Sequence, residues 1–153
     1  MVKRTSTWDE GCPVARALDV IGDWWSLLII RDAFDGVTRF SQFQQGLGIA
    51  KGMLATRLRE LVDKGILRTA PVSDRSAYRQ YVLTAKGEAL FPVIVTLRQW
   101  AESELYTADE PHSRLVERAT GRSLAKLHPC DQDGRKVEWT DTRVDPPKAH
   151  QSG

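Results

Sequence analysis

The stretch KGMLATRLRELVDKGILRTAPVSDRSAYRQYVL, residues 51–83, decides the fold of this chain. Its first half repeats leucine and valine at positions i, i+4, i+7 and i+8, which is the spacing of one buried helix face, and Gly65 ends that helix. Its second half holds two β-prone runs, residues 67–72 and 78–83, separated by the polar, turn-forming sequence SDRSA. We therefore predict an amphipathic helix followed directly by a β-hairpin with a basic tip.

Three shorter helices are predicted before residue 51. The first, residues 13–21, begins with a proline that suits the first helical position and is interrupted by a glycine. The second, residues 24–34, follows the capping residue Asp23 and stops at an Asp-Gly pair. The third is a short helix that Ser41 would cap and a glycine at position 48 would close.

The helix predicted over residues 24–34 is apolar around nearly its whole circumference. It is far too short to cross a membrane, which takes about 20 apolar residues. Both of its faces must therefore be covered by protein. Either a second subunit covers one of them, or the helix is enclosed within a single subunit.

Helices followed by a basic hairpin in this order form a winged helix-turn-helix. The major groove of B-DNA is about 12 Å wide and admits one helix, so the entering face needs short or flexible side chains that reach base edges. The outward face of the helix after residue 50 meets this requirement, with base-readout candidates Lys51, Gly52, Ala55, Thr56 and Arg59. Phosphate or wing contacts are expected from Arg57, Lys64, Arg75 and Arg79. A basic helix face is also the ordinary appearance of solvated surface.

Charge and composition favour nucleic-acid binding over catalysis. The net charge is only +2, but residues 51–79 hold seven Lys/Arg against three Asp/Glu. No nucleophile, base and orienting group stand at a recognisable spacing, and no phosphate-binding glycine loop or metal triad is present in the sequence, so we expect neither an enzyme nor a cofactor. With two cysteines and no apolar run in residues 1–12, we expect a reduced, cytoplasmic protein.

The C-terminal third changes character. After the hairpin, Thr84 can cap a further helix, interrupted by Pro92, that continues to about residue 105. Residues 107–145 form a polar extension, in which an Asp-Gly pair at 133–134 predicts a small β-hairpin. We thus expect an arm at 1–11, a globular domain at 12–106, the extension, and a disordered tail at 146–153.

Several motifs between residues 12 and 105 resemble the HxlR branch of the MarR-like transcriptional regulators. They are the Cys-Pro-Val start at residue 12, Ile-Gly-Asp-x-Trp at 21, Leu-x-x-Arg-Leu-x-x-Leu at 54 with Gly-Ile-Leu at 65, and Tyr-x-Leu-Thr-x-x-Gly at 81. The resemblance implies a mainly α fold with a small β-hairpin wing (α+β), dimerised through N- and C-terminal helices. A C-terminal hairpin extension would be added to it.

The resemblance also implies roles for residues outside the hairpin region. Candidates for the homodimer interface are Val14, Leu18, Trp24, Trp25, Ile94, Leu97, Trp100, Ala101 and Leu105. Some family members respond to oxidants through a cysteine at the place of Cys12, where a helix N-terminus raises thiol reactivity. The alternative for that residue is a buried, small apolar side chain. His128 and Cys130 lack the further ligands that a tetrahedral zinc site needs, so we expect no metal.

Two residues depart from the family pattern at the start of the recognition helix. The family usually places a capping serine where this chain has Ala50, and Gly52 weakens the same turn. The expected function is therefore a homodimeric regulator that binds double-stranded DNA at a pseudo-palindromic operator, controlled by thiol oxidation or by an unidentified small effector, with this turn loose before DNA binds. The alternative is a winged-helix protein-interaction module without DNA affinity.

Overall fold

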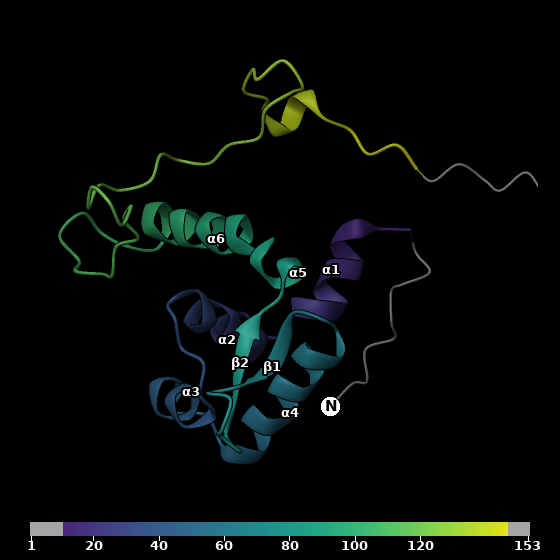
Figure 1. Ribbon diagram of the computed structural model, residues 1–153. Coiled ribbons are helices and arrows are strands. Elements are labelled where there is room, and N and C mark those ends of the chain that lie inside the picture. Colours follow the sequence, from purple (N-terminus) through teal and green to yellow (C-terminus); the bar gives the residue numbers. More distant parts are fainter. Residues whose placement is uncertain (1–10, 147–153) are drawn as a thin grey trace, which may run out of the picture. The chain divides into compact units, whose positions relative to one another are not determined.

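The computed structural model describes residues 11–146 (Figure 1). Its contacts divide the chain after Phe91 into two compact units, residues 1–91 and 92–153, and each is described by itself. The division falls earlier than the boundary that we predicted near residue 106. Residues 1–10 of the predicted arm and 147–153 of the predicted tail lie outside the described residues.

The first unit contains the predicted helices and wing. Its helices before the hairpin are α1 (Pro13–Ile21), α2 (Trp24–Phe34), α3 (Phe40–Leu47) and α4 (Lys51–Asp63). The carboxylate of Asp23 caps α2 as predicted, because its Oδ1 accepts the backbone N–H of Ser26 at 2.9 Å. The structure is mainly helical with one small antiparallel sheet among its described residues, consistent with a winged helix-turn-helix.

The prediction that Ser41 caps α3 is wrong. The helix begins two residues earlier than that cap would place it, at Phe40 with Arg39 at the N-cap position, and Ser41 lies within the first turn. The side chain of Gln42 makes this start favourable, because its Oε1 accepts the backbone N–H of Arg39 at 3.2 Å. A glutamine at the third helical position thus satisfies an amide that a capping serine would leave open.

The wing consists of β1 (Leu67–Pro71) and β2 (Arg79–Leu83), paired antiparallel with Leu67 opposite Leu83. Both strands lie within the predicted runs. The amide of Tyr81 on β2 also donates to the carbonyl of Thr38 at 2.7 Å, which attaches the hairpin to the loop before α3. The sheet contacts both α4 and α2, and Figure 1 shows the hairpin beside them.

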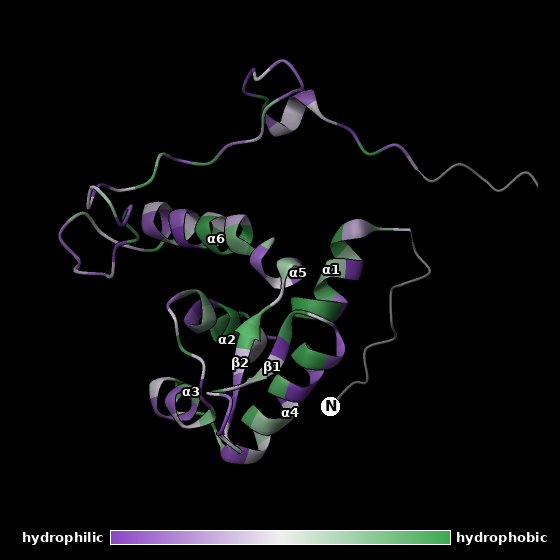
Figure 2. Ribbon diagram, viewed as in Figure 1, coloured by the Kyte–Doolittle hydropathy of each residue, from purple (hydrophilic) through white to green (hydrophobic). Residues whose placement is uncertain are grey.

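The core of this unit lies between α2, α3, α4 and the start of the wing. Its largest fully buried side chains are Ile29, Ile30, Phe43, Leu54, Leu58, Leu61 and Leu67. Figure 2 shows α2 as mostly hydrophobic, whereas α4 alternates between hydrophobic and hydrophilic residues along its length. The predicted apolar face of α4 is therefore the face that packs inward.

The Thr-x-x-Gly motif after the wing forms the start of α5 (Ala85–Glu88). The hydroxyl of Thr84 accepts the amide of Gly87 at 3.0 Å and donates to the carbonyl of Gly65 at 2.5 Å. A Cβ at Gly87 would collide with the carbonyl oxygen of Ile66. Both motif residues are thus explained by the tight approach of α5 to the end of α4. The helix breaks before Pro92, which lies instead in the first turn of α6 (Phe91–Glu104), where proline is tolerated.

The second unit contains α6 and a mostly irregular extension. The hairpin predicted around residues 133–134 forms with minimal pairing. Cys130 and Lys136 make one antiparallel bridge, flanked by backbone hydrogen bonds from Asp131 to Arg135 at 2.8 Å and from Val137 to Pro129 at 3.1 Å. The amide of Arg135 donates to the carboxylate of Asp131 instead of to a longer strand ladder. Another bridge joins Val116 to Ser123, and a short 3₁₀ turn, η2, spans Trp139–Asp141. None of the helices within residues 11–146 has the length and apolar character needed to cross a membrane.

Candidate nucleic-acid interface

The turn between α3 and α4 fixes how the recognition helix leaves its neighbour. Gly48 ends α3 in the left-handed conformation, at φ 63°, and donates to the carbonyl of Gln44 at 3.0 Å. A glycine adopts this conformation without the steric penalty that other residues pay. The next side chain, Ile49, is buried and anchors the turn in the core.

Burial of one face of α4 determines which residues point outward. Leu54, Leu58 and Leu61 are buried. The predicted readout residues consequently lie on the other sides of the helix: Lys51, Gly52 and Arg59 are exposed, and Ala55 and Thr56 are half-buried. The structure also exposes Met53 by 41% on the first turn, a residue that our sequence reasoning omitted. Its position one residue before a buried leucine is the signal that would have found it.

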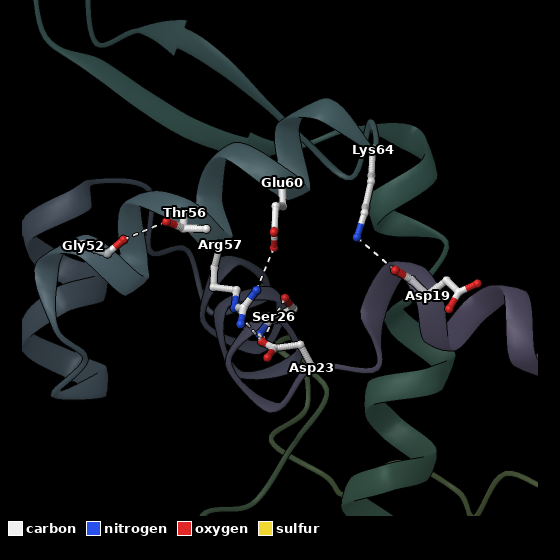
Figure 3. Close-up of polar contacts among 8 residues, drawn as sticks. All are labelled: Asp19, Asp23, Ser26, Gly52, Thr56, Arg57, Glu60 and Lys64. Atoms are coloured by element: carbon white, nitrogen blue, oxygen red, sulfur yellow. Dashed lines mark hydrogen bonds and ion pairs between the residues drawn. The ribbon is translucent and has the colours of Figure 1, made fainter. Parts of the chain in front are cut away.

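The first turn of α4 lacks a side-chain cap, as expected. Ala50 occupies the N-cap position and no side chain accepts a hydrogen bond there. A Cβ built on Gly52 would meet nothing within 4 Å, so packing does not require glycine at that position. The hydroxyl of Thr56 donates to the carbonyl of Gly52 at 3.0 Å, which leaves its lone pairs available for an incoming donor (Figure 3).

Arg57 points inward from α4 rather than toward open solvent. Figure 3 shows its guanidinium between Asp23 and Glu60. Its Nη1 lies 2.9 Å from Glu60 Oε2, and its Nε lies 3.2 Å from Asp23 Oδ1 without hydrogen-bond geometry. The side chain is only 21% exposed. Because the same carboxylate caps α2, Arg57 connects the recognition helix to the beginning of α2.

Lys64, at the other end of α4, is also occupied within the chain. Its Nζ donates to the backbone carbonyl of Asp19 at 2.9 Å, near the end of α1 (Figure 3). We had predicted phosphate contacts for Arg57 and Lys64, and that prediction stays untested. The structure nevertheless shows that Arg57 connects α4 to the N-cap of α2 and that Lys64 connects it to the end of α1.

The wing carries one arginine that bonds across the hairpin and two exposed arginines for which no such bond is described. Arg79 lies on β2 and donates to the hydroxyl of Thr69 on β1 at 2.9 Å, so it stiffens the hairpin. Arg75 lies in the connecting loop and is exposed. Arg68, also exposed and opposite Val82 on the hairpin, was missed by our sequence reasoning, although strict alternation after the buried Leu67 places it outward.

The apolar residues proposed for a dimer interface are largely uncovered within their own units. In the first unit Val14, Leu18 and Trp24 are exposed and Trp25 is half-buried, with the two tryptophan rings in edge contact at 5.6 Å. In the second unit Leu97, Trp100 and Leu105 are exposed, whereas Ile94 and Ala101 are half-buried. The helix that looked apolar all round therefore buries its middle and leaves its first residue open.

The two cysteines are exposed thiols. Cys12 occupies the N-cap position of α1 and makes no side-chain capping bond. The alternative of a buried apolar residue does not describe this position. Cys130 lies within the extension, 3.8 Å from the carbonyl of His128. In the described part of the chain no group of three or more His, Cys, Asp or Glu residues could hold a metal ion.

Comparison with known proteins agrees with this geometry. The model of the HxlR-like helix-turn-helix family matches residues 20–109. The chain is 36% identical over 137 residues to Rv3095 of Mycobacterium tuberculosis H37Rv, an uncharacterized HTH-type transcriptional regulator, with 90% of this chain and 87% of the relative covered.

Two solved structures extend the comparison. The crystal structure of PA1607, a candidate transcription factor, is similar with a TM-score of 0.87 and 50% identity over 92% of this chain and 99% of that one. The redox regulator HypR in its reduced form has a TM-score of 0.57 and 33% identity, covering 61% of this chain and 94% of its own. With its family model, relatives and fold in agreement, this chain belongs to the HxlR-like helix-turn-helix family of transcriptional regulators.

Proposed function

We propose that this protein binds a pseudo-palindromic operator as a homodimer and regulates transcription in the cytoplasm. The observation that carries the proposal is the asymmetry of α4. One face is anchored by buried leucines, while Lys51 and Arg59 on the outer side are exposed and make no hydrogen bond or ion pair within residues 11–146. Cations held outward on a rigid helix of this kind suit a polyanionic groove.

The outward residues divide into two roles. Lys51, Thr56 and Arg59 would contact base edges, with the small residues Gly52 and Ala55 allowing close approach of the helix. Arg75 would contact phosphate or the adjacent minor groove from the wing. Arg57, Lys64 and Arg79, which have partners within the chain, would shape the reading surface rather than touch DNA.

The proposed dimer would cover the apolar residues that each unit leaves open. Trp24 is 69% exposed in the first unit and Trp100 is 59% exposed in the second. A tryptophan buries about 150–250 Å², which at about 25 cal/mol per Å² makes several kcal/mol per pair as an upper estimate. A second copy of the chain would place two recognition helices in successive major grooves, about 34–36 Å apart.

The decisive experiment is selection of fragments bound by the full chain from genomic DNA, followed by titration of the selected site at about 50 and 200 mM salt. We expect a two-fold symmetric site and an affinity that falls about 10³-fold or more over that range if six phosphates are contacted. An affinity for DNA that is absent, or unaffected by salt, would favour the protein-interaction alternative. Sedimentation at low micromolar concentration tests the dimer separately, and a folded monomer would contradict it.

We further propose that oxidation of Cys12 controls DNA binding. Its exposure at the N-terminus of α1 and the similarity to the redox regulator HypR support this proposal. Diamide accepts two electrons and two protons as the Cys12 thiols of the two subunits become a disulfide, and this should release the operator. The Cys12→Ser variant should keep its DNA in diamide, whereas Cys130→Ser should behave as wild type. Equal release from all three proteins would eliminate Cys12 as the switch.

A further inference from the structure

A solvent-accessible cavity of about 230 Å³ lies within residues 92–153, between α6 and the first part of the extension. Its apolar wall is formed by Val95, Leu115 and Leu124, of which the valine is buried. Its polar wall contains Arg98 and Glu102 from α6 and Arg114 from the extension. The volume equals about eight water molecules at liquid density and is slightly below the usual range for drug-sized ligands.

Hydrogen bonds within this unit hold the walls of the cavity in place. The side chain of Gln99 donates to the carbonyl of Ala125 at 2.9 Å and accepts the amide of Leu127 at 2.8 Å. Arg98 donates through Nη1 to the carbonyl of Ser113 at 2.7 Å. The extension is therefore attached to α6 at residue 113 and at residues 125–127, before and after the cavity-lining residues Arg114 and Leu124, so a ligand would meet a preformed site.

The two arginines retain donors for a ligand. A guanidinium has five N–H donors in a planar fork. Within residues 11–146 the hydrogen bonds of Arg98 use only Nη1, and Arg114 uses Nη2, which donates to Ser123 Oγ at 2.8 Å. Each side chain is thus held at one nitrogen, and its remaining N–H donors suit a planar, negatively charged group.

Glu102 is the one acidic residue among the residues that line the cavity, and it only weakly compensates the positive charge of Arg98 and Arg114. Its Oε1 lies 3.8 Å from Arg98 Nη1, at the outer limit of an ion pair. Arg114 has no acidic partner among the described residues. The two arginines and one glutamate leave a net charge of +1 beside an apolar wall.

We propose that this cavity binds a small organic acid, with its carboxylate held by Arg98 and Arg114 and its hydrocarbon body against Val95, Leu115 and Leu124. The cavity is thereby a candidate effector site. It belongs to the extension, so a binding test on the unliganded protein needs no DNA, and the proposal stands or falls independently of the operator. The apolar wall selects a free organic acid over an inorganic anion, which would gain nothing from it.

Isothermal titration of the full chain with sodium benzoate tests the proposal. We expect saturable binding with a dissociation constant on the order of millimolar, as befits a ligand of this size. Benzamide, which has the same shape without the charge, and inorganic phosphate, which has charge without the ring, should both bind at least about tenfold more weakly, the loss expected for one charged hydrogen bond or a buried ring.

Substitutions of single lining residues test which side chains bind the carboxylate. Arg114→Gln should weaken benzoate binding about tenfold or more, and Glu102→Gln should strengthen it because the opposing charge is removed. Arg118→Gln is the matched control, since Arg118 is an exposed arginine of the same extension that does not line the cavity. Absence of saturable benzoate binding, equal binding of phosphate, or equal loss of affinity in the Arg118→Gln control would each overturn the proposal.

The circular dichroism spectrum of each variant must match that of the wild-type protein. A second variant, Leu124→Ser, leaves both arginines intact and removes part of the apolar wall, so it should weaken benzoate binding more than phosphate binding.

Discussion

The two sides of α4 carry the same kind of charge but have opposite environments. Arg57 lies beside the carboxylate of Asp23 at the start of α2, and Lys64 donates to the carbonyl of Asp19 in the last turns of α1. Lys51 and Arg59 are exposed on the outer side and have no such partner among residues 11–146. A basic residue on a recognition helix can therefore either stabilise the fold or contact DNA, and its partners within the chain distinguish the two roles.

This division gives α4 two polar anchors in addition to its buried leucines. One anchor lies at the middle of the helix and the other at its C-terminal end, so both set its orientation relative to α1 and α2. Losing an anchor should change stability first and DNA binding second. Losing an outward cation should change DNA binding first and stability second.

The largest effect is expected for Arg59→Ala. If this side chain contacts a base edge, operator affinity should fall by about 1–3 kcal/mol, roughly 5- to 150-fold, and preference at one position should relax. The free energy of unfolding should change by less than about 0.5 kcal/mol, because the residue is exposed. Fluorescence anisotropy with the selected operator and urea unfolding measure the two quantities. An Arg59→Ala protein that is less stable but binds the operator with unchanged affinity would contradict the assignment of Arg59 to the DNA-binding side of α4.

Arg57→Gln should show the opposite balance. It removes a part-buried guanidinium from Asp23 and Glu60, so we expect a loss of about 1–2 kcal/mol in the free energy of unfolding. The slope of log affinity against log salt should stay unchanged, since no phosphate contact is lost. A slope reduced by about one unit at unchanged stability would instead restore the phosphate role that the sequence predicted.

Gly52→Ala should stabilise the protein by up to about 1 kcal/mol, because alanine is the better helix former. Nothing lies within 4 Å of the Cβ position, so no clash offsets the gain. Gly87→Ala is the matched control and should destabilise the fold, since its Cβ would collide with the carbonyl of Ile66. Urea unfolding at one fixed protein concentration compares the variants, and a destabilised Gly52→Ala protein would show that the first turn is packed.

The smallest effect concerns the salt dependence of DNA affinity, which should differ between a variant in the wing and one at the C-terminal end of α4. Arg75→Gln should reduce the salt slope by about one unit, because an exposed cation that contacts phosphate is removed. Lys64→Gln should leave the slope unchanged, since its Nζ is bound to the carbonyl of Asp19. Titrations of both variants over the same salt range test this, and equal slopes for the two would remove the distinction between outward and anchored cations.

Much of the architecture could be read from residue spacing. The helix bounds and both wing strands follow from periodicity, and the cap of α2 follows from Asp23. The start of α3 could not be read in the same way, because the side chain of Gln42 accepts the amide of Arg39 and so places the N-cap before Ser41. The hairpin in the extension follows from its Asp-Gly pair, but its restriction to one bridge does not, since the carboxylate of Asp131 accepts the amide of Arg135.

The candidate site was only half predictable. Alternation of leucines shows which face of α4 is buried, so the outward position of Lys51 and Arg59 follows from the sequence. No spacing rule shows that Arg57 meets Asp23, or that the amine of Lys64 reaches the carbonyl of Asp19, because these partners are distant in the chain. The cavity beside Arg98 depends on equally distant residues of the extension.

The order of helices and strands, the inward face of α4 and the family to which the chain belongs all follow from the sequence. Those properties depend on local periodicity, on turn residues and on motifs that lie within a few positions of one another. The tertiary structure was needed to show which cations of α4 bind partners within the chain and which are exposed and available to DNA. A long charged side chain finds its partner through the packing of whole helices, and that packing is a property of the folded chain rather than of any short segment.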